Sequence, residues 1–162
     1  MEYIKVNHDC LKPFLPEDAK ILILGSFPSP GSRKAQFYYA YKTNRFFQTL
    51  AGVFQEKTPM NIEERKTFLQ KHHIALYDVI ESCEIKGASD SSIRNVIVAD
   101  IPALIQGTQI VQVFTTGTKA GNLYRKFIGE DNIMLPSPSA ANAAMSLSSL
   151  ISSYRVILDY LN

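Results

Sequence analysis

The chain of 162 residues has no tryptophan, only two cysteines and no long apolar run. Cys10 and Cys83 cannot supply the four thiolates of a structural zinc or iron–sulfur site, and they cannot form a framework of disulfides. A membrane-spanning helix needs roughly 18 apolar residues in a row, and no segment approaches that length. Met1–Lys5 also lacks the apolar stretch of a signal peptide. We therefore expect a cytoplasmic protein with no membrane partner.

The common cofactor and catalytic motifs are missing as well. Gly25 is not followed by the glycines of a dinucleotide-binding loop, and Thr116–Lys119 lacks the first glycine of a phosphate-binding loop. Ser26 and Ser29 do not stand in the Gly-x-Ser-x-Gly pattern of serine hydrolases. The histidines lack the spacing of a metal site or a hydrolytic triad: His8, His72 and His73. We expect neither a metal nor a cofactor.

Acidic residues are absent from two long segments, although the net charge of the chain is only +2. Residues 19–55 contain five basic residues and no acid, and residues 132–158 contain one basic residue and no acid. If these segments meet in space, their shared surface would tolerate phosphates. The distribution fits chance in a nearly neutral chain equally well.

Hydrophobic residues make up 46% of the chain, enough for a sizeable core. Short apolar runs, typical of buried strands, alternate with segments of helical periodicity. The runs are Lys20–Gly25, Ile74–Val79, Ile110–Thr115 and Ile133–Leu135. This order predicts one α/β domain, residues 1–162. We expect a three-layer sandwich in which helices cover both faces of a central, mostly parallel sheet of about four strands.

The expected helices follow capping and turn signals. One helix is expected after the cap Asn44, and another over Glu63–Lys71 after the cap Asn61. Further helices are expected over Ile101–Ile105 and Thr118–Ile128, and a last helix begins near Ala140 or Asn142. Residues 26–32 are rich in proline and glycine, which predicts a loop. In parallel sheets the active site lies beyond the carboxyl ends of the strands, so residues 26–43 and 137–141 are the candidate site loops.

The first of these loops leads into an aromatic segment, Phe37–Phe47, with interleaved lysine and arginine. Aromatic rings beside basic side chains suit the stacking of a base and the neutralisation of its phosphates. Phe46 and Phe47 fit a core position better. For Tyr38, Tyr39 and Tyr41, base stacking and plain loop packing remain equally open.

Six blocks of the chain, taken in order, resemble the uracil-DNA glycosylase superfamily, and most closely its hypoxanthine-DNA (deoxyinosine) glycosylase branch. They are Gly25–Ser29, Phe37–Tyr39, Thr43–Phe47, Leu76–Cys83, Gly87–Arg94 and Leu135–Ala143. The resemblance implies an enzyme that flips a damaged nucleotide out of DNA and hydrolyses its N-glycosidic bond. Hypoxanthine is the expected base, with uracil and xanthine as further candidates.

The resemblance also assigns the residues of the base pocket. It implies that the base stacks on Tyr39 and that the first motif lines the pocket: Gly25, Ser26, Phe27 and Pro28. In the uracil and mismatch branches an Asp or Asn, two residues after the glycine, holds the attacking water. Phe27 stands there in this chain, and the resemblance to the hypoxanthine branch places that role on Asn44. An amide can only orient water and stabilise charge. A plain helix cap is the other interpretation of Asn44, and both roles can coexist.

DNA is the expected partner, bound by a monomer. The resemblance matches the second loop to one that enters the minor groove: Ser137, Pro138, Ser139 and Ala140. Its small tip, Ala140–Ala141, predicts a weak wedge. Basic residues of the first acid-free segment are expected on phosphates: Arg33, Lys34, Lys42 and Arg45. The alternative function is a catalytically silent α/β module that binds nucleic acid or a nucleotide in the same cleft.

Overall fold

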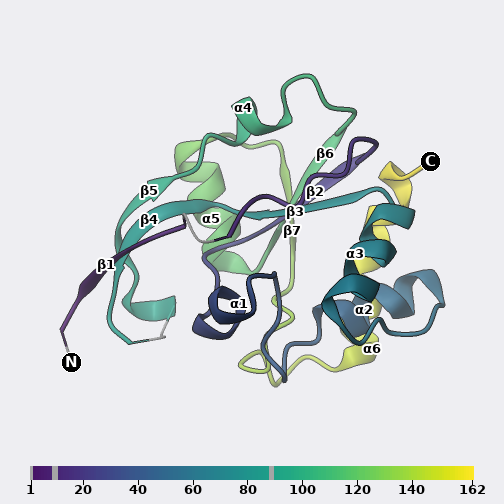
Figure 1. The fold of residues 1–162 in the computed structure, drawn as a ribbon, viewed down its shortest axis with the longest axis horizontal. Coiled ribbons are helices and arrows are strands. Elements are labelled where there is room, and N and C mark those ends of the chain that lie inside the picture. The colour runs from purple at the N-terminus through teal and green to yellow at the C-terminus, as the bar shows by residue number, and fades with distance from the viewer. Residues whose placement is uncertain (1, 9–10, 88–89) are drawn as a thin grey trace.

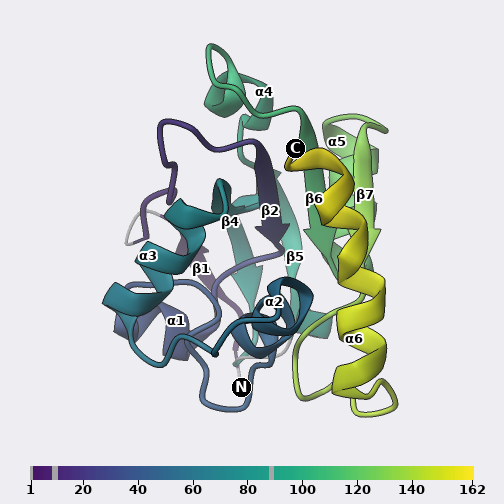
Figure 2. The ribbon, with the colours of Figure 1, turned by 90° about the vertical axis from the view of Figure 1, so that its right-hand side faces the viewer.

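The computed structural model describes residues 2–8, 11–87 and 90–162. Cys10 and, within the Gly87–Arg94 block, Ala88 and Ser89 lie outside these residues. The centre of the molecule is a parallel sheet in the order β3-β2-β6-β7 (Figures 1 and 2). Its strands are β2 (Ile21–Gly25), β3 (Ile74–Asp78), β6 (Gln112–Thr116) and β7 (Asn132–Leu135). The four predicted apolar runs form these strands, which confirms the α/β prediction.

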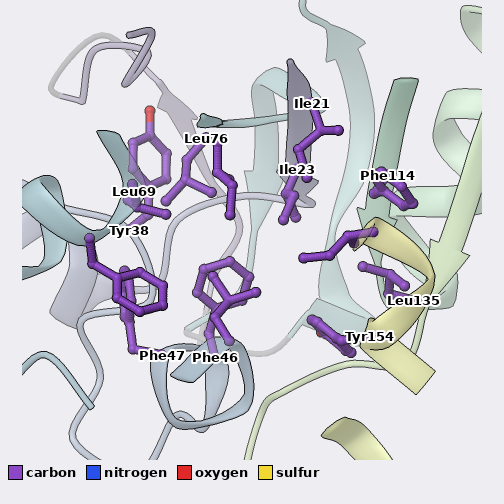
Figure 3. Close-up of a cluster of buried hydrophobic side chains, with 14 of the residues drawn as sticks. Ile21, Ile23, Tyr38, Phe46, Phe47, Leu69, Leu76, Phe114, Leu135 and Tyr154 are labelled. Carbon is purple, nitrogen blue, oxygen red and sulfur yellow. The ribbon is translucent and has the colours of Figure 1, made fainter. Parts of the chain in front are cut away.

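Alternate residues of β2 point to opposite faces of the sheet, because side chains alternate along a strand. Ile21 and Ile23 belong to a core cluster with α2 (Phe46–Phe54), α3 (Ile62–Lys71) and α6 (Leu147–Tyr154), shown in Figure 3. The 3-10 helix η2 (Arg155–Tyr160) extends α6 on the same face.

Leu22 and Leu24 face the other way and pack against α4 (Ile101–Ile105) and α5 (Thr118–Phe127). All five residues of β2 are buried, because both faces of this central strand are covered by helices.

The register of the sheet brings its carboxyl ends to one edge. Gly25 is paired with Asp78, and Thr116 is paired with Leu135. In Figure 2 the arrowheads of β2, β6 and β7 point toward α1 (Pro30–Ala35) and the loop before α6. The two candidate site loops therefore lie on the same side of the sheet.

A second sheet was not predicted. Strands β1 (Ile4–Asn7), β4 (Ile80–Ile85) and β5 (Arg94–Val98) pair antiparallel in the order β1-β4-β5. One residue separates β3 from β4, so the chain passes directly from the parallel sheet into the antiparallel one. The short 3-10 helix η1 (Asp90–Ser92) lies between β4 and β5.

One loop prediction and one helix prediction were wrong in position. Residues 26–32 are not all loop, because α1 begins at Pro30, where Ser29 caps it by accepting a hydrogen bond from the Ser32 amide at 3.1 Å. The last helix begins at Leu147 rather than near Ala140 or Asn142, and Ser146 is its cap. No helix within the described residues is long and apolar enough to cross a membrane.

Candidate active site

A cavity of about 670 Å³ opens at the carboxyl edge of the parallel sheet. Its lining comes from residues 25–32, 38–44 and 137–141, from Asp78 and Thr116 at the ends of β3 and β6, and from Ile85 and Ser91. The backbone amide of Arg45 donates to the carbonyl of Pro138 at 3.0 Å, which joins the two loops. The two acid-free segments therefore meet in space.

The cavity brings together most of the residues that were expected to bind substrate or DNA. Its lining includes Gly25, Ser26, Phe27, Pro28, Tyr39, Asn44, Ser137, Pro138, Ser139 and Ala140. Their individual roles stay predictions. Arg33 and Lys34 lie in the last turn of α1, and Lys42 is exposed between the lining residues Tyr41 and Thr43. These three basic residues therefore lie close to the loops that form the cavity.

Tyr39 is held in the cavity wall by three constraints. Its backbone has a left-handed φ of 52°, which is uncommon for an aromatic residue. Its ring stacks on Phe46 with centroids 3.8 Å apart and planes 14° apart, and its hydroxyl bonds Thr116 Oγ1 at 3.0 Å. Burial, with the charge of Asp78, raises the pKa of Tyr39 well above its usual value, so the hydroxyl stays neutral. The result is a fixed aromatic surface.

The other aromatic residues of the segment divide between core and surface. Phe46, Phe47 and Tyr38 are buried in the main core, as Figure 3 shows. The Tyr38 hydroxyl donates to the Lys12 carbonyl at 2.7 Å. Tyr41 is 58% exposed at the rim of the cavity. Tyr38 is therefore mainly a core residue although it borders the cavity, whereas Tyr39 and Tyr41 offer more of their surface to a ligand.

Asn44 caps α2 and also lines the cavity. Its Oδ1 accepts a hydrogen bond from the Phe46 amide at 2.9 Å, so it caps the first turn of α2. Arg45 occupies the formal cap position and makes no side-chain cap bond. Asn44 is also half-buried in the cavity lining. Because the cap uses Oδ1, the amide NH₂ group remains able to donate to a water or a ligand.

The guanidinium of Arg45 binds the loop before α6 rather than pointing freely into solvent. It donates to the carbonyls of Met145 at 2.6 Å, Asn142 at 3.1 Å and Ser139 at 3.2 Å. The Asn142 side chain in turn donates to the Ser137 carbonyl at 3.1 Å. This arrangement favours a loop-positioning role for Arg45 over the expected phosphate contact.

A buried His–Asp pair at the cavity was missed by sequence reasoning. Asp78 is 5% exposed, and its Oδ2 lies 2.7 Å from Nε2 of His8, which is 4% exposed. His8 does not lie in either candidate site loop, but it contacts the cavity lining through Asp78. The one available signal for Asp78 was that it is a lone acid near the end of an apolar run. Nothing in the sequence pointed to His8, which is 70 residues away.

A family model for the uracil DNA glycosylase superfamily matches residues 12–160. The chain belongs to this superfamily. A "Hypoxanthine DNA glycosylase" of Methanosarcina acetivorans is 32% identical over 82% of this chain and 86% of its own length. One of the same name from Methanosarcina barkeri is 28% identical over 80% of this chain and 85% of its own length.

The fold of the chain also resembles a solved structure. A solution NMR structure of an M. acetivorans protein that carries the name uracil DNA glycosylase superposes with a TM-score of 0.74 at 30% identity. The match covers 91% of this chain and 96% of that one. The superfamily match begins at residue 12, so His8 and strand β1 precede it.

Proposed function

We propose that the protein is a monofunctional DNA glycosylase that hydrolyses the N-glycosidic bond of a flipped, deaminated base, with hypoxanthine as the main substrate. The observation that carries the proposal is the cavity in which Tyr39 and Asn44 lie together, in a chain of the uracil DNA glycosylase superfamily. The names of the two Methanosarcina relatives support hypoxanthine as the base. We further propose that the protein acts as a monomer.

The cavity suits a base that has left the helix. A flipped base needs an aromatic surface for stacking and polar groups that read its edge. Tyr39 offers the aromatic surface, and its contacts with Phe46 and Thr116 hold that ring in place before the base arrives. The loop of Ser137–Ala141, held by Arg45, would lie against the strand from which the base has left.

Asn44 is the group that we propose orients the attacking water. Its NH₂ group donates to the water oxygen, while Oδ1 stays anchored to the Phe46 amide. An amide does not take up the proton of the water, so the mechanism relies on departure of the base as a stabilised anion. The sugar passes through an oxocarbenium-like state, and the oriented water then adds to its C1′ carbon. The proton that the added water loses neutralises the departed base anion.

The proposal is tested with a duplex and a single-stranded oligonucleotide, each with one deoxyinosine at a defined position. The protein is incubated with excess chelator, and alkali then cleaves the strand at abasic sites. We expect cleavage at the deoxyinosine in both the presence and the absence of chelator. Matched oligonucleotides with uracil, xanthine or an undamaged base rank the substrates, and the undamaged strand should remain intact.

Two results would contradict the proposal. Strand cleavage without alkali would show a lyase activity and exclude a monofunctional glycosylase. Binding of the oligonucleotides without release of any base would instead support the catalytically silent binding module. Measurement of the free base by chromatography separates these outcomes from a contaminating nuclease, which releases no base.

A further inference from the structure

The cavity lining, as far as the structure describes it, contains one carboxylate, that of Asp78. Its two oxygen atoms have different surroundings. Oδ2 faces His8 Nε2 at 2.7 Å, whereas Oδ1 makes no hydrogen bond with a described residue. A methyl group on Gly25 would lie 2.6 Å from Oδ1 of Asp78 and 3.4 Å from the Tyr39 hydroxyl. Oδ1 therefore borders the space that Gly25 leaves open, next to the proposed stacking surface.

His8 fixes the orientation of this carboxylate. It follows β1, and its backbone amide donates to the Glu81 carbonyl of β4 at 2.8 Å, so the antiparallel sheet holds it in place. The imidazole packs edge-on against Tyr77, with ring centroids 4.6 Å apart, and against Phe27, at 5.9 Å. With Nε2 bound to Oδ2, the carboxylate cannot rotate without breaking a buried hydrogen bond.

The charge state of the pair follows from its surroundings. Burial lowers the pKa of His8, but the hydrogen bond and the charge of Asp78 outweigh that effect, so the pKa lies above 6.5. The other titratable side chains that face the pair are Tyr38, Tyr39 and Tyr77. Burial and the charge of Asp78 raise the pKa of Tyr39 and of Tyr77, so both of these hydroxyls are neutral. The hydrogen bond to Asp78 and the charge of Asp78 therefore favour the protonated form of His8.

Deamination changes the ring nitrogen that such an acceptor would meet. N1 of adenine and N3 of cytosine are acceptors, whereas N1 of hypoxanthine and N3 of uracil carry a hydrogen. A carboxylate only accepts hydrogen bonds, so it attracts the N–H of the deaminated base and repels the lone pair of the normal one. An unpaired buried acceptor is costly, so a base without the N–H is rejected.

We propose that Asp78 reads the ring N–H of the flipped base through Oδ1, and that His8 is the positioning residue that holds Asp78 in this orientation. This inference rests on the proposed function, because it names the group by which the same cavity distinguishes hypoxanthine from adenine and uracil from cytosine. It also gives a role in base selection to His8, a residue that lies before the start of the superfamily match.

The test compares single-turnover excision of hypoxanthine and of 1-methylhypoxanthine, which has a methyl group in place of the N1 hydrogen. The wild type should excise hypoxanthine at least tenfold faster. D78N offers at best a neutral acceptor in place of a charged one, and we expect it to remove hypoxanthine about 10-fold more slowly than wild type. H8F/D78L replaces both partners by apolar groups, which avoids a lone buried charge. It should lose about 100-fold on hypoxanthine and show little preference between the two bases.

His8 is tested through the ratio of the two excision rates. H8F removes the donor and should reduce the preference for hypoxanthine, whereas H8Q keeps an N–H donor and should restore it. A merely structural role of His8 would change both rates equally and leave the ratio intact. D18N is the matched control, because Asp18 pairs with His73 at 3.1 Å in a partly exposed pair and does not line the cavity.

The outcomes separate the two claims. A wild type that releases neither hypoxanthine nor uracil overturns the proposed function and this inference with it. An active wild type with D78N and H8F/D78L equally active overturns the inference alone. If these variants lose the same factor on both bases, Asp78 acts in hydrolysis and not in reading, which also overturns it. Circular dichroism and thermal melting establish that each variant is folded.

Discussion

Asn44 links the stability of α2 to the proposed chemistry, and substitution separates the two. We expect N44A to lose about 10²–10³ in single-turnover excision, the usual effect of removing one well-placed polar group. It should lose only about 1 kcal/mol of stability, because it also removes a helix cap. N44D keeps an acceptor for the Phe46 amide, so it controls for the cap. An N44A protein that melts lower but excises at the wild-type rate would leave Asn44 as a cap alone.

The His8–Asp78 pair predicts how stability depends on pH. His8 has a pKa above 6.5 in the folded protein and about 6.5 when unfolded. The folded state thus binds the proton more tightly. The stabilisation is fully present below about pH 6.5 and is lost as the pH rises through the folded pKa. Urea midpoints of wild type and H8Q, measured at steps from about pH 6 upward, should converge at high pH.

A second histidine contributes the opposite trend and does not affect that comparison. Burial lowers the pKa of His72, although Glu56 partly opposes the effect. Its contribution to stability is therefore fully present above its unfolded pKa of about 6.5 and is lost as the pH falls from there through the lower folded pKa. Because wild type and H8Q share His72, the difference between their midpoints reports on His8. A constant difference across the pH range would mean that the His8–Asp78 pair does not titrate as the structure implies.

At the scale of elements, one arginine holds the loop between β7 and α6. Arg45 donates to three carbonyls of that loop, so R45M should free residues 139–145 and cost about 1–3 kcal/mol. We expect faster hydrogen exchange at amides of residues 139–146 and slower excision, with the core amides unaffected. R33M is the matched control for the exchange measurement, because no hydrogen bond joins Arg33 to that loop. Unchanged exchange in the loop of R45M would contradict the positioning role.

The elements also show what sequence patterns can and cannot reveal. The strands of the parallel sheet were predictable because helices cover both faces, which produces uninterrupted apolar runs such as Ile21–Leu24. Strands β4 and β5 mix buried and exposed residues, and β4 follows β3 without a turn, so no pattern marked them. The start of α6 was misplaced because Asn142 forms a turn instead of a cap.

The same limit applies to the candidate site. The loops after β2 and β7 could be predicted from their place at strand ends, and the family blocks marked Tyr39 and Asn44. Asp78 is supplied by a third strand end, and its partner His8 directly follows strand β1 of the second sheet. Contacts between residues so far apart in the chain depend on how the two sheets join. Local periodicity carries no information on that junction.

At the scale of the whole molecule, the two acid-free segments form one face around the cavity, which predicts how DNA binding responds to salt. Each phosphate contact contributes about −0.9 to the slope of log affinity against log salt. K42Q, R33Q and K34Q should therefore each flatten the slope by about one, whereas R45Q should do so less, because Arg45 is bound to carbonyls. Lys126, exposed in the last turn of α5 on the opposite face of the sheet, provides the control K126Q.

Fluorescence anisotropy with a labelled abasic-analogue duplex at several salt concentrations measures the slopes. Equal slopes for wild type and all of these variants would mean that the separation of charge along the chain has no part in DNA binding.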